Sequence, residues 1–479
     1  MAVGVKIVVL GGGPGGYVAA VRAAQAGAEV TLIEQDEVGG TCLNRGCIPS
    51  KVLMTSAELF EKFRKASEFG LNVEGRFLPD MARLMQRKHK VVQDQVAGIL
   101  RLLKHHKIRL IRGVGRIASP DQIQVKTQGG EVEHVPWDRL ILALGSEAMP
   151  IPSLPFDGQR IISSNEALSL AEIPDSILIV GAGVIGCEFA FILSALGSRV
   201  TLVEAMDRLL PLPSVDEDCS KILQREMKKR KIGIMTNRTL IGVDENKGKL
   251  RATIGPSPFA DGLSDKLKEP LSLDVDKVLV CIGRSPNTAD VGLERIGVKS
   301  DEKGWIVANE RMETNVPRVY AIGDVLGPAK IMLAHVASRE AFVAVSNSMG
   351  KACVMDYKAV PGAIFTMPEV ANVGLTESQA RGAGYNVRSD TVLFRNIGKS
   401  QVIGQIAGQA KIVSDLDTGK VLSVHIIGPH ATELIGEATL AVNTGCTTQQ
   451  LADTIHPHPT LSEILLETSL KSIDMALHG

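Results

Sequence analysis

The stretch that organises this chain is Gly39-Gly40-Thr41-Cys42-Leu43-Asn44-Arg45-Gly46-Cys47-Ile48-Pro49-Ser50-Lys51. It holds two cysteines five residues apart, with glycines ahead of each and a lysine at its end. Glycine lets backbone come close to a flat ligand, because no side chain stands in the way. A disulfide can close if the two Cα atoms come within roughly 7 Å, and a small strained ring is reduced more readily than a structural bridge. The stretch favours a redox-active pair. Two buried free thiols are the alternative, and only the surrounding motifs decide against it.

Composition limits what the whole chain can be. Its 479 residues are about three times a typical domain of roughly 150 residues, which predicts three or four core-forming units. A net charge of zero argues against a nucleic-acid partner or a membrane surface. Seven cysteines, scattered apart from the first pair, argue against a secreted disulfide framework. No signal peptide precedes the first strand and no run of about 18 apolar residues occurs, so we expect a cytoplasmic protein, or one from an organelle matrix if a transit peptide has been removed.

A dinucleotide-binding fingerprint precedes the cysteines. An apolar strand at 6–10 runs into a glycine-rich turn, a helix follows, and a second strand at 30–33 ends at Glu34. Gly11, Gly13 and Gly16 have the GxGxxG spacing. In such a unit the first glycine allows the turn, the second admits the pyrophosphate and the third lets the helix approach the sheet, while the acid binds ribose hydroxyls. The phosphates rest on the helix N-terminus.

The same unit recurs in the middle of the chain. A strand at 177–180 leads to Gly181, Gly183 and Gly186, and a second strand at 200–203 ends at Glu204. The first glycine and the acid are 23 positions apart in both copies. Two such units predict two bound dinucleotides. A carboxylate at Glu204 repels a 2′-phosphate, so the second unit favours NAD over NADP.

The remaining elements complete an α/β protein with two Rossmann-like domains and a C-terminal α+β domain. Asp80 is expected to cap a long amphipathic helix, and two further apolar strands end at Ser146 and at Arg284. Asp324 follows another strand, at the carboxyl edge where α/β ligands bind, and a helix beginning near 332–335 points its N-terminus the same way. The expected divisions are a first domain at 1–150, a second at 151–283, a central segment at 284–355 and a C-terminal domain at 356–479.

Two histidines near the end of the chain permit three interpretations. They lie in His456-Pro457-His458-Pro459-Thr460-Leu461-Ser462-Glu463. Thr460 and Glu463 match a capping box, which needs no catalytic role. Two histidines one residue apart can ligate zinc, but no nearby Cys or Asp pattern completes a site. A histidine held by a carboxylate is also a general base that titrates near neutrality, and Glu463 can serve both as cap and as that carboxylate.

Taken together, the motifs resemble the flavoprotein disulfide reductases, and within them the branch that oxidises dihydrolipoamide. The resemblance spans nearly the whole chain and rests on GGTCLNRGCIPSK (39–51), both glycine fingerprints, YAIGDV (320–325), MLAH (332–335) and HPTLSE (458–463) in the family's order. It implies that the first unit binds FAD, that the second binds NAD and that the C-terminal domain forms a homodimer. It also implies that His and Glu of one subunit face the disulfide of the other.

The resemblance assigns roles to residues of this chain. Cys42 is implied as the interchange thiol that meets the dithiol, and Cys47 as the charge-transfer thiol over the flavin. His458 is implied as the base and Glu463 as the carboxylate that orients it. The other implied FAD contacts are Gly11, Gly13, Gly16, Glu34, Lys51, Gly115, Leu144, Gly145, Ser146, Asp324, Met332, Leu333, Ala334 and His335. The implied NAD contacts are Gly181, Gly183, Gly186, Glu188, Glu204, Thr239 and Gly283, with Glu188 also implied as the partner of Lys51. No metal is implied. Arg45, Val336, Arg339 and Pro457 depart from the family pattern.

The partners implied are lipoyl-domain proteins, either the acyltransferase of a 2-oxo acid dehydrogenase complex or the H protein of glycine cleavage. Two alternatives stay open. A sibling disulfide reductase is one, although the acid at 204 argues against the NADP-dependent glutathione type, and the C-terminal vicinal cysteines of mercuric reductases are absent. A redox-silent scaffold that binds FAD and NAD is the other.

Overall fold

The computed structural model describes residues 4–75, 77–260, 262 and 264–478. Contacts divide the chain into two units. The first contains the chain up to Leu53 together with Asp80–Met149 and Gly283–Asp356, and the second contains Met54–Pro79, Pro150–Ile282 and the chain from Tyr357 onward. Each unit is an α/β assembly, which confirms the predicted fold class.

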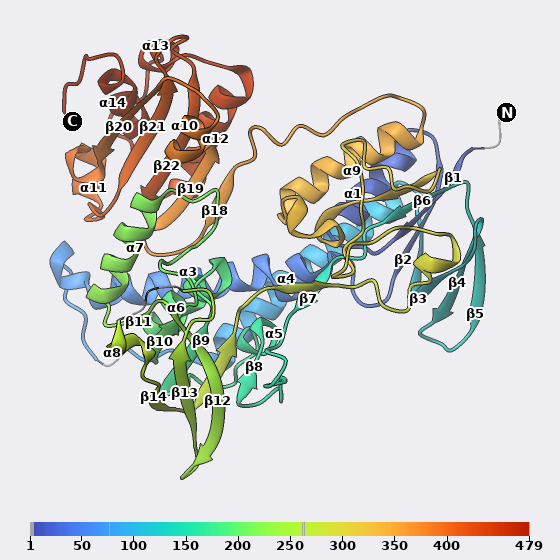
Figure 1. Cartoon of the computed structure of the whole chain (residues 1–479), viewed down its shortest axis with the longest axis horizontal. Coiled ribbons are helices and arrows are strands. Elements are labelled where there is room, and N and C mark those ends of the chain that lie inside the picture. Colours follow the sequence, from blue (N-terminus) through green and yellow to red (C-terminus); the bar gives the residue numbers. More distant parts are fainter. Residues whose placement is uncertain (1–3, 76, 261, 263, 479) are drawn as a thin grey trace. The chain divides into compact units, whose positions relative to one another are not determined.

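A seven-stranded sheet of order β17-β6-β1-β2-β3-β4-β5 forms the centre of the first unit. Neighbours from β17 to β3 pair in parallel, whereas β3, β4 and β5 pair antiparallel. Helices α1 (Pro14–Gln25) and α9 (Ala334–Ser348) pack against each other (Figure 1). The strands are β1 (Lys6–Leu10), β2 (Glu29–Glu34), β3 (Arg109–Ser119), β4 (Gln122–Thr127), β5 (Val132–Pro136), β6 (Arg139–Leu142) and β17 (Val319–Ala321). Parallel strands that end together place their following loops at one edge, where the expected ligand contacts gather.

Helices and a small ribbon complete this unit. The helical segments are α1 (Pro14–Gln25), α2 (Gly40–Arg45), α4 (Met81–His105), η2 (Leu293–Arg295), η3 (Gly323–Ala329) and α9 (Ala334–Ser348), and α3 (Cys47–Arg64) begins here. The Asp80 side chain accepts the Arg83 amide at 3.0 Å, so the predicted cap of α4 is confirmed. Strand β7 (Ser146–Ala148) pairs with β16 (Arg284–Pro286).

The second unit contains a parallel sheet of order β11-β10-β9-β15-β8 and a three-stranded antiparallel sheet. Buried aliphatic residues from both sheets, including Leu178, Val278 and Ile254, pack into one core. The parallel strands are β8 (Ile161–Ile162), β9 (Ser176–Val180), β10 (Arg199–Val203), β11 (Gly233–Met235) and β15 (Lys277–Val280). The other elements are β12 (Arg238–Asn246), β13 (Lys249–Pro256), β14 (Leu271–Val275), η1 (Ala66–Phe69), α5 (Ser164–Ala167), α6 (Val184–Leu196), α7 (Glu217–Lys229) and α8 (Asp265–Lys268).

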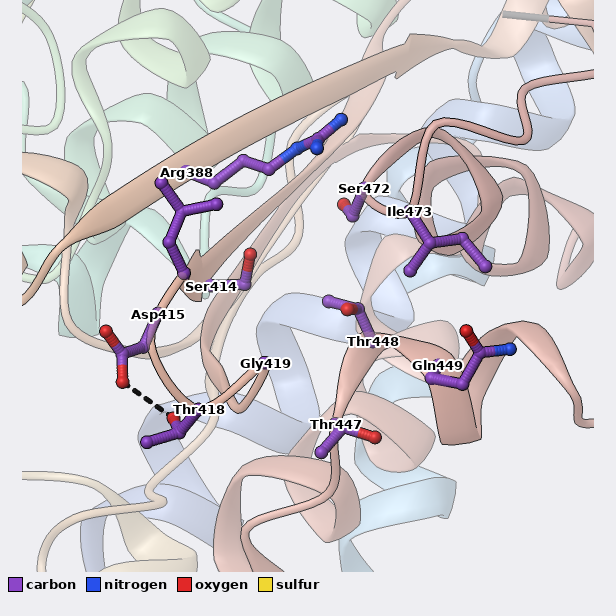
Figure 2. Close-up of a pocket in the computed structure, with 11 residues that line it drawn as sticks. Arg388, Ser414, Asp415, Thr418, Gly419, Thr447, Thr448, Gln449, Ser472 and Ile473 are labelled. Atoms are coloured by element: carbon purple, nitrogen blue, oxygen red, sulfur yellow. Dashed lines mark hydrogen bonds between the residues drawn. The ribbon is translucent and has the colours of Figure 1, made fainter.

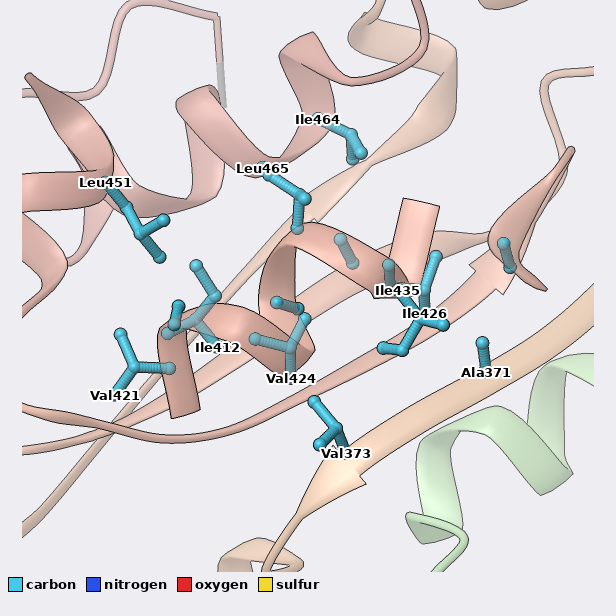
Figure 3. Packing of buried hydrophobic residues seen from close by; sticks show 14 of the residues in the cluster. Ala371, Val373, Ile412, Val421, Val424, Ile426, Ile435, Leu451, Ile464 and Leu465 are labelled. Carbon is cyan, nitrogen blue, oxygen red and sulfur yellow. The ribbon is translucent and has the colours of Figure 1, made fainter. Parts of the chain in front are cut away.

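The C-terminal part of this unit is an antiparallel sheet of order β18-β19-β22-β21-β20 covered by helices. Figure 3 shows its core, in which Ile412 and Val424 of the strands meet Ile435 of α12 and Leu465 of α14. Burying each such aliphatic side chain stabilises the folded state by roughly 1.5–3 kcal/mol relative to leaving it exposed to water. The strands are β18 (Gly362–Ile364), β19 (Glu369–Gly374), β20 (Val387–Leu393), β21 (Gln409–Asp415) and β22 (Val421–Gly428). The helices are α10 (Glu377–Gly382), η4 (Phe394–Asn396), α11 (Gly398–Val402), α12 (Ala431–Thr444), α13 (Thr448–Ala452) and α14 (Glu463–Lys471).

Candidate active site

The two cysteines lie on consecutive helices, to which the sequence analysis assigned no secondary structure. Cys42 is in α2, and Cys47 is the first residue of α3. Gly39 and Gly40 adopt φ of 95° and 58°, and a Cβ on Gly40 would lie 2.6 Å from the Cα of Gly13. A side chain at position 40 is excluded both by this contact and by the positive φ. The glycines therefore bring the cysteine stretch against the first fingerprint turn.

The two thiols are in contact. A hydrogen bond to Cys47 and then burial raise the pKa of the Cys42 thiol, whereas nearby Lys51 lowers it. Cys42 therefore keeps its proton in the reduced pair. Cys47 stands at a helix N-terminus, where backbone amides stabilise a thiolate. The two sulfurs are therefore in chemically unequal surroundings.

The first fingerprint uses its three glycines in different ways. A Cβ on Gly11 (φ 103°) would lie 2.2 Å from the Ala143 carbonyl oxygen, and one on Gly16 would lie 1.8 Å from the Gly11 carbonyl oxygen. By contrast, the nearest described atom to a Cβ on Gly13 is 3.9 Å away. The outer glycines thus permit close packing and the middle one leaves room. Glu34 ends β2, and its two carboxylate oxygens accept the amides of Gly12 (2.6 Å) and Asp36 (2.8 Å).

The second fingerprint repeats this arrangement. A Cβ on Gly181 (φ 101°) would lie 2.3 Å from the Cys281 carbonyl oxygen, and one on Gly186 would lie 1.9 Å from the Gly181 carbonyl oxygen. By contrast, a Cβ on Gly183 would have no described atom from outside its own turn and helix within 4 Å. The carboxylate oxygens of Glu204 accept the amides of Ala182 (2.6 Å) and Met206 (2.8 Å). Both acids are therefore fixed at the mouth of a glycine turn beside the N-terminus of a helix, the place where a dinucleotide phosphate is bound.

A third group of expected cofactor contacts meets at the carboxyl edge of the first sheet. The Ser146 hydroxyl donates to Asp324 Oδ2 at 2.7 Å, and Gly145 adopts φ 70°. The helix α9 begins at Ala334 as predicted, so the expected contacts at 332–335 form its N-terminal turn. Gly115 lies elsewhere on the sheet, where a Cβ would meet Leu10 at 2.5 Å, and its space is needed for packing.

The histidine and glutamate near the C-terminus form a dyad. Nδ1 of His458 is 2.8 Å from Glu463 Oε1, and Glu463 Oε2 accepts the Thr460 amide at 2.9 Å. Burial raises the pKa of Glu463, but hydrogen bonds from His458 and Thr460 outweigh burial and hold it below its usual value. Glu463 is the first residue of α14, and Ser462 at the cap position makes no side-chain cap bond. The capping box is therefore half formed, while the carboxylate contacts the imidazole. The His458 side chain is 77% exposed in the single chain.

His456 is held differently. Its Nε2 lies 2.9 Å from Glu437 Oε1 and its Nδ1 lies 2.9 Å from the Thr454 carbonyl oxygen. The hydrogen bond to Glu437 raises the pKa of His456. With its side chain only 4% exposed, His456 anchors the loop that carries His458 to helix α12.

Comparison with known proteins identifies the family to which this arrangement belongs. The chain matches the pyridine nucleotide-disulphide oxidoreductases over residues 5–341 and the dimerisation domain of the same proteins over residues 360–469. The chain belongs to this family.

Relatives align along their whole length. A protein from Chlamydia muridarum named dihydrolipoyl dehydrogenase is 42% identical over 473 residues, covering 98% of this chain and 97% of the relative. A protein of the same name from Bacillus subtilis is 40% identical over 487 residues and covers both chains completely. Among solved structures, LpdA from Mycobacterium tuberculosis superimposes with a TM-score of 0.88 at 27% identity, over 98% of this chain and 99% of that one.

FAD and NAD(H) are the cofactors of this oxidoreductase, and its residues fit both. The fit rests on the two glycine turns, each with an open middle position and an acid fixed at its mouth. The individual contacts stay predictions. Lys51, in the cysteine stretch, hydrogen-bonds Ser50 at 3.3 Å.

The implied NAD contacts outside the second glycine turn lie in different local settings. Glu188 Oε1 accepts the Phe365 amide at 3.0 Å, which ties α6 to the C-terminal sheet, and the expected pairing of Glu188 with Lys51 stays a prediction. Thr239 is in β12, directly after Arg238, whose amide donates to the Glu204 carbonyl oxygen at 3.0 Å. Gly283 adopts φ 142° at the exit of β15.

Sequence reasoning missed four residues of this oxidoreductase. Burial and then the charge of Cys42 raise the pKa of Tyr17. Arg284 and Asn287 bond the Leu144–Ser146 loop, and Glu340 accepts the Gly323 amide at 2.7 Å. The one available signal was the run Gly283-Arg284-Ser285-Pro286-Asn287 directly after a predicted strand.

Other surface features lie outside the predicted site. A pocket of about 310 Å³ in the C-terminal domain is lined by hydroxyl groups, including those of Ser414, Thr448 and Ser472, and Figure 2 shows Thr418 bonded to Asp415 at its rim. None of the predicted site residues lines it. Within the described residues, no helix is both long and apolar enough to cross a membrane, and no group of three or more His, Cys, Asp or Glu is placed to hold a metal.

Proposed function

We propose that this oxidoreductase oxidises protein-bound dihydrolipoamide to lipoamide with NAD as acceptor. The observation that carries the proposal is the contact between Cys42 and Cys47, which the glycines press against the first dinucleotide turn. Full-length relatives named dihydrolipoyl dehydrogenase support the same substrate. A carboxylate at Glu204 supports NAD over NADP.

The dyad starts the reaction by moving a proton. Glu463 holds Nδ1 of His458 at 2.8 Å, so Nε2 is the atom that takes a proton from the dithiol. The resulting thiolate is the nucleophile, because a neutral thiol attacks poorly. It attacks the Cys42 sulfur of the disulfide, a substrate–Cys42 bond forms, and the Cys42–Cys47 bond breaks.

The leaving sulfur is Cys47. It departs with the electron pair as a thiolate, which the N-terminus of α3 stabilises. The second substrate thiol then attacks the substrate sulfur bonded to Cys42 and closes lipoamide. The substrate–Cys42 bond breaks, and Cys42 leaves with the electron pair and takes up the proton that this thiol loses. When bound, FAD supplies the path by which the two electrons pass from the dithiol pair to NAD.

The exposed dyad supports an assembly of two chains. His458 is 77% exposed in the single chain, and the chain carries the dimerisation domain of its family. In the proposed homodimer the dyad of each copy serves the cysteine pair of the other copy. The substrate proteins are lipoyl domains, either of a 2-oxo acid dehydrogenase acyltransferase or of a glycine cleavage H protein.

A turnover assay tests this function. The FAD-loaded full chain is mixed with dihydrolipoamide and NAD, and formation of NADH is followed, with NADP in a parallel sample. We expect rapid NADH formation and little NADPH. No turnover with dihydrolipoamide, but reduction of glutathione disulfide by NADPH, would identify a sibling reductase instead. FAD binding without any dithiol-dependent turnover would identify a scaffold.

A further inference from the structure

Two side chains at the start of the central segment (284–355) hold the loop at Leu144–Ser146. Arg284 donates from Nε to the Ser146 hydroxyl and from Nη2 to the Ser146 carbonyl oxygen, both at 2.6 Å. Asn287 donates from Nδ2 to the Leu144 carbonyl oxygen at 3.0 Å and from its amide to the Gly145 carbonyl oxygen at 3.2 Å. We call Arg284 and Asn287 the clamp.

The clamp reaches Asp324 through Ser146. The Ser146 hydroxyl accepts from Arg284 and donates to Asp324 Oδ2 at 2.7 Å, and Arg284 Nε is itself 3.6 Å from that oxygen. Ser146 is 3% exposed, and the Arg284 side chain is 18% exposed. Water screens ion pairs and hydrogen bonds between such buried groups only weakly, so these interactions hold a geometry more firmly than surface contacts do.

Asp324 is also supported from its own backbone. It follows Gly323 (φ 74°), whose amide donates to Glu340 Oε2 at 2.7 Å. Glu340 is 1% exposed and lies on α9. The expected cofactor acid is thus fixed through its carboxylate by Ser146 and the clamp, and through the preceding amide by Glu340.

The loop needs this support because it lies beyond the end of β6 at Leu142 and passes through Gly145 in a positive-φ conformation. Its three carbonyl groups are bonded to Arg284 and Asn287 rather than to neighbouring strands of the main sheet. Removing a donor leaves a carbonyl oxygen without its partner and returns conformational freedom to the glycine.

We propose that Arg284 and Asn287 are positioning residues of the flavin site, which fix the Leu144–Ser146 loop and the Asp324 carboxylate in the geometry that receives FAD. The positive charge of Arg284 lies 3.6 Å from the Asp324 carboxylate, whose oxygens can accept hydrogen bonds from hydroxyl groups of the cofactor. The inference rests on the FAD assignment and is independent of which dithiol the protein oxidises.

The test uses Arg284→Met, Arg284→Lys and Asn287→Asp in the full chain. Arg251→Met is the matched control. Arg251 also donates two hydrogen bonds, from Nε and Nη2, to a single residue, Asp274, but in an exposed hairpin. FAD binding to the apoprotein is measured by quenching of flavin fluorescence, and FAD release from the holoprotein by its recovery. The melting temperature of each apoprotein and the visible spectrum of each holoprotein are recorded alongside.

We expect Arg284→Met to weaken FAD binding by about tenfold to a hundredfold and Asn287→Asp by about tenfold, the effect of losing charged and neutral hydrogen bonds respectively. Arg284→Lys keeps the positive charge but cannot make both hydrogen bonds to Ser146, so its FAD affinity should lie between those of the wild type and Arg284→Met. Apoprotein melting temperatures stay close to wild type, and Arg251→Met binds FAD normally. Wild-type affinity and spectrum in Arg284→Met would overturn the proposal, and so would an affinity loss matched by an equally destabilised apoprotein. A wild-type chain that binds no FAD would instead overturn the flavin assignment.

Discussion

Glu463→Gln tests what the Glu463 carboxylate contributes to the His458–Glu463 dyad. Gln is isosteric with Glu and still offers an oxygen to the Thr460 amide, so the local fold is retained. What disappears is the negative charge 2.8 Å from His458 Nδ1. The imidazole then takes up a proton without a carboxylate to stabilise the positive charge, and proton abstraction from the dithiol slows.

The size of the effect follows from the contact that is lost. A hydrogen bond to a charged group contributes about 1.5–3 kcal/mol, which corresponds to roughly a tenfold to hundredfold lower kcat for dithiol oxidation. Stability changes much less. The His458 side chain is 77% exposed, and exposed ion pairs contribute about 0.2–1 kcal/mol to the free energy of unfolding.

The same helix offers a matched control. Glu467 contacts His478 Nδ1 at 2.9 Å, in a dyad of the same geometry outside the predicted site. Glu467→Gln should leave turnover unchanged. In Glu463→Gln, stopped-flow reduction of the flavin by dihydrolipoamide slows, whereas its reduction by NADH keeps the wild-type rate. Equal losses in the two variants, or wild-type flavin reduction by dihydrolipoamide in Glu463→Gln, would refute the assigned role.

Four further outcomes are expected. Cys42→Ser abolishes lipoamide turnover but leaves the flavin reducible by NADH, and reduction of the flavin by dithiol in that variant would contradict the role of Cys42. His458→Gln keeps its FAD and its melting temperature while most dithiol oxidation is lost, and normal turnover would exclude it as the base. Lys411→Met removes the cation bonded at 2.9–3.2 Å to Asp216, Asp218 and Glu377. Glu377 keeps its pairing with Arg381, but the buried Asp216 carboxylate loses this charge, so denaturant titration should show about 3–5 kcal/mol less stability. A Lys411 hydrogen bond lowers the pKa of Glu377 from 4.5 to about 2. Because that pKa is depressed in the folded state, its contribution of at most about 3 kcal/mol is complete above pH 4.5 and is lost as the pH falls toward 2. Glu377→Gln should therefore destabilise at pH 7 and much less near pH 3, and a pH-independent loss would contradict the ion pair.

Local sequence patterns predicted many of the strands, because each depends on neighbouring residues. The strands expected to end at Ser146 and at Arg284 instead end at Leu142 and at Val280. The apolar run at 6–10 coincides with β1, and the glycines of both fingerprints occupy the crowded and open positions expected of them. The contact between His458 and Glu463 was also predictable, since the two residues are five apart at a helix start.

The cysteine helices were missed for a local reason. Glycines flank α2, and Pro49 lies in the first turn of α3, so the composition resembles a loop. Proline is nonetheless tolerated in the first helical turn, because the amide it lacks has no intrahelical partner there.

The clamp was missed for a different reason. Arg284 and Asn287 contact residues 138 and 143 positions away, and Lys411 meets Asp216 across 195 positions. Such contacts depend on how separate segments pack, and no periodicity or turn signal reports them. Long-range polar contacts are therefore the part of this site that only the structure supplies.

The proposed mechanism requires the Cys47 sulfur to lie against the bound flavin. Anaerobic addition of dihydrolipoamide to the FAD-loaded chain, followed by absorbance, tests that placement directly. We predict a long-wavelength charge-transfer band in the wild type that is absent in Cys47→Ser. A wild-type protein that turns over without the band, or a Cys47→Ser protein that still shows it, would contradict the account.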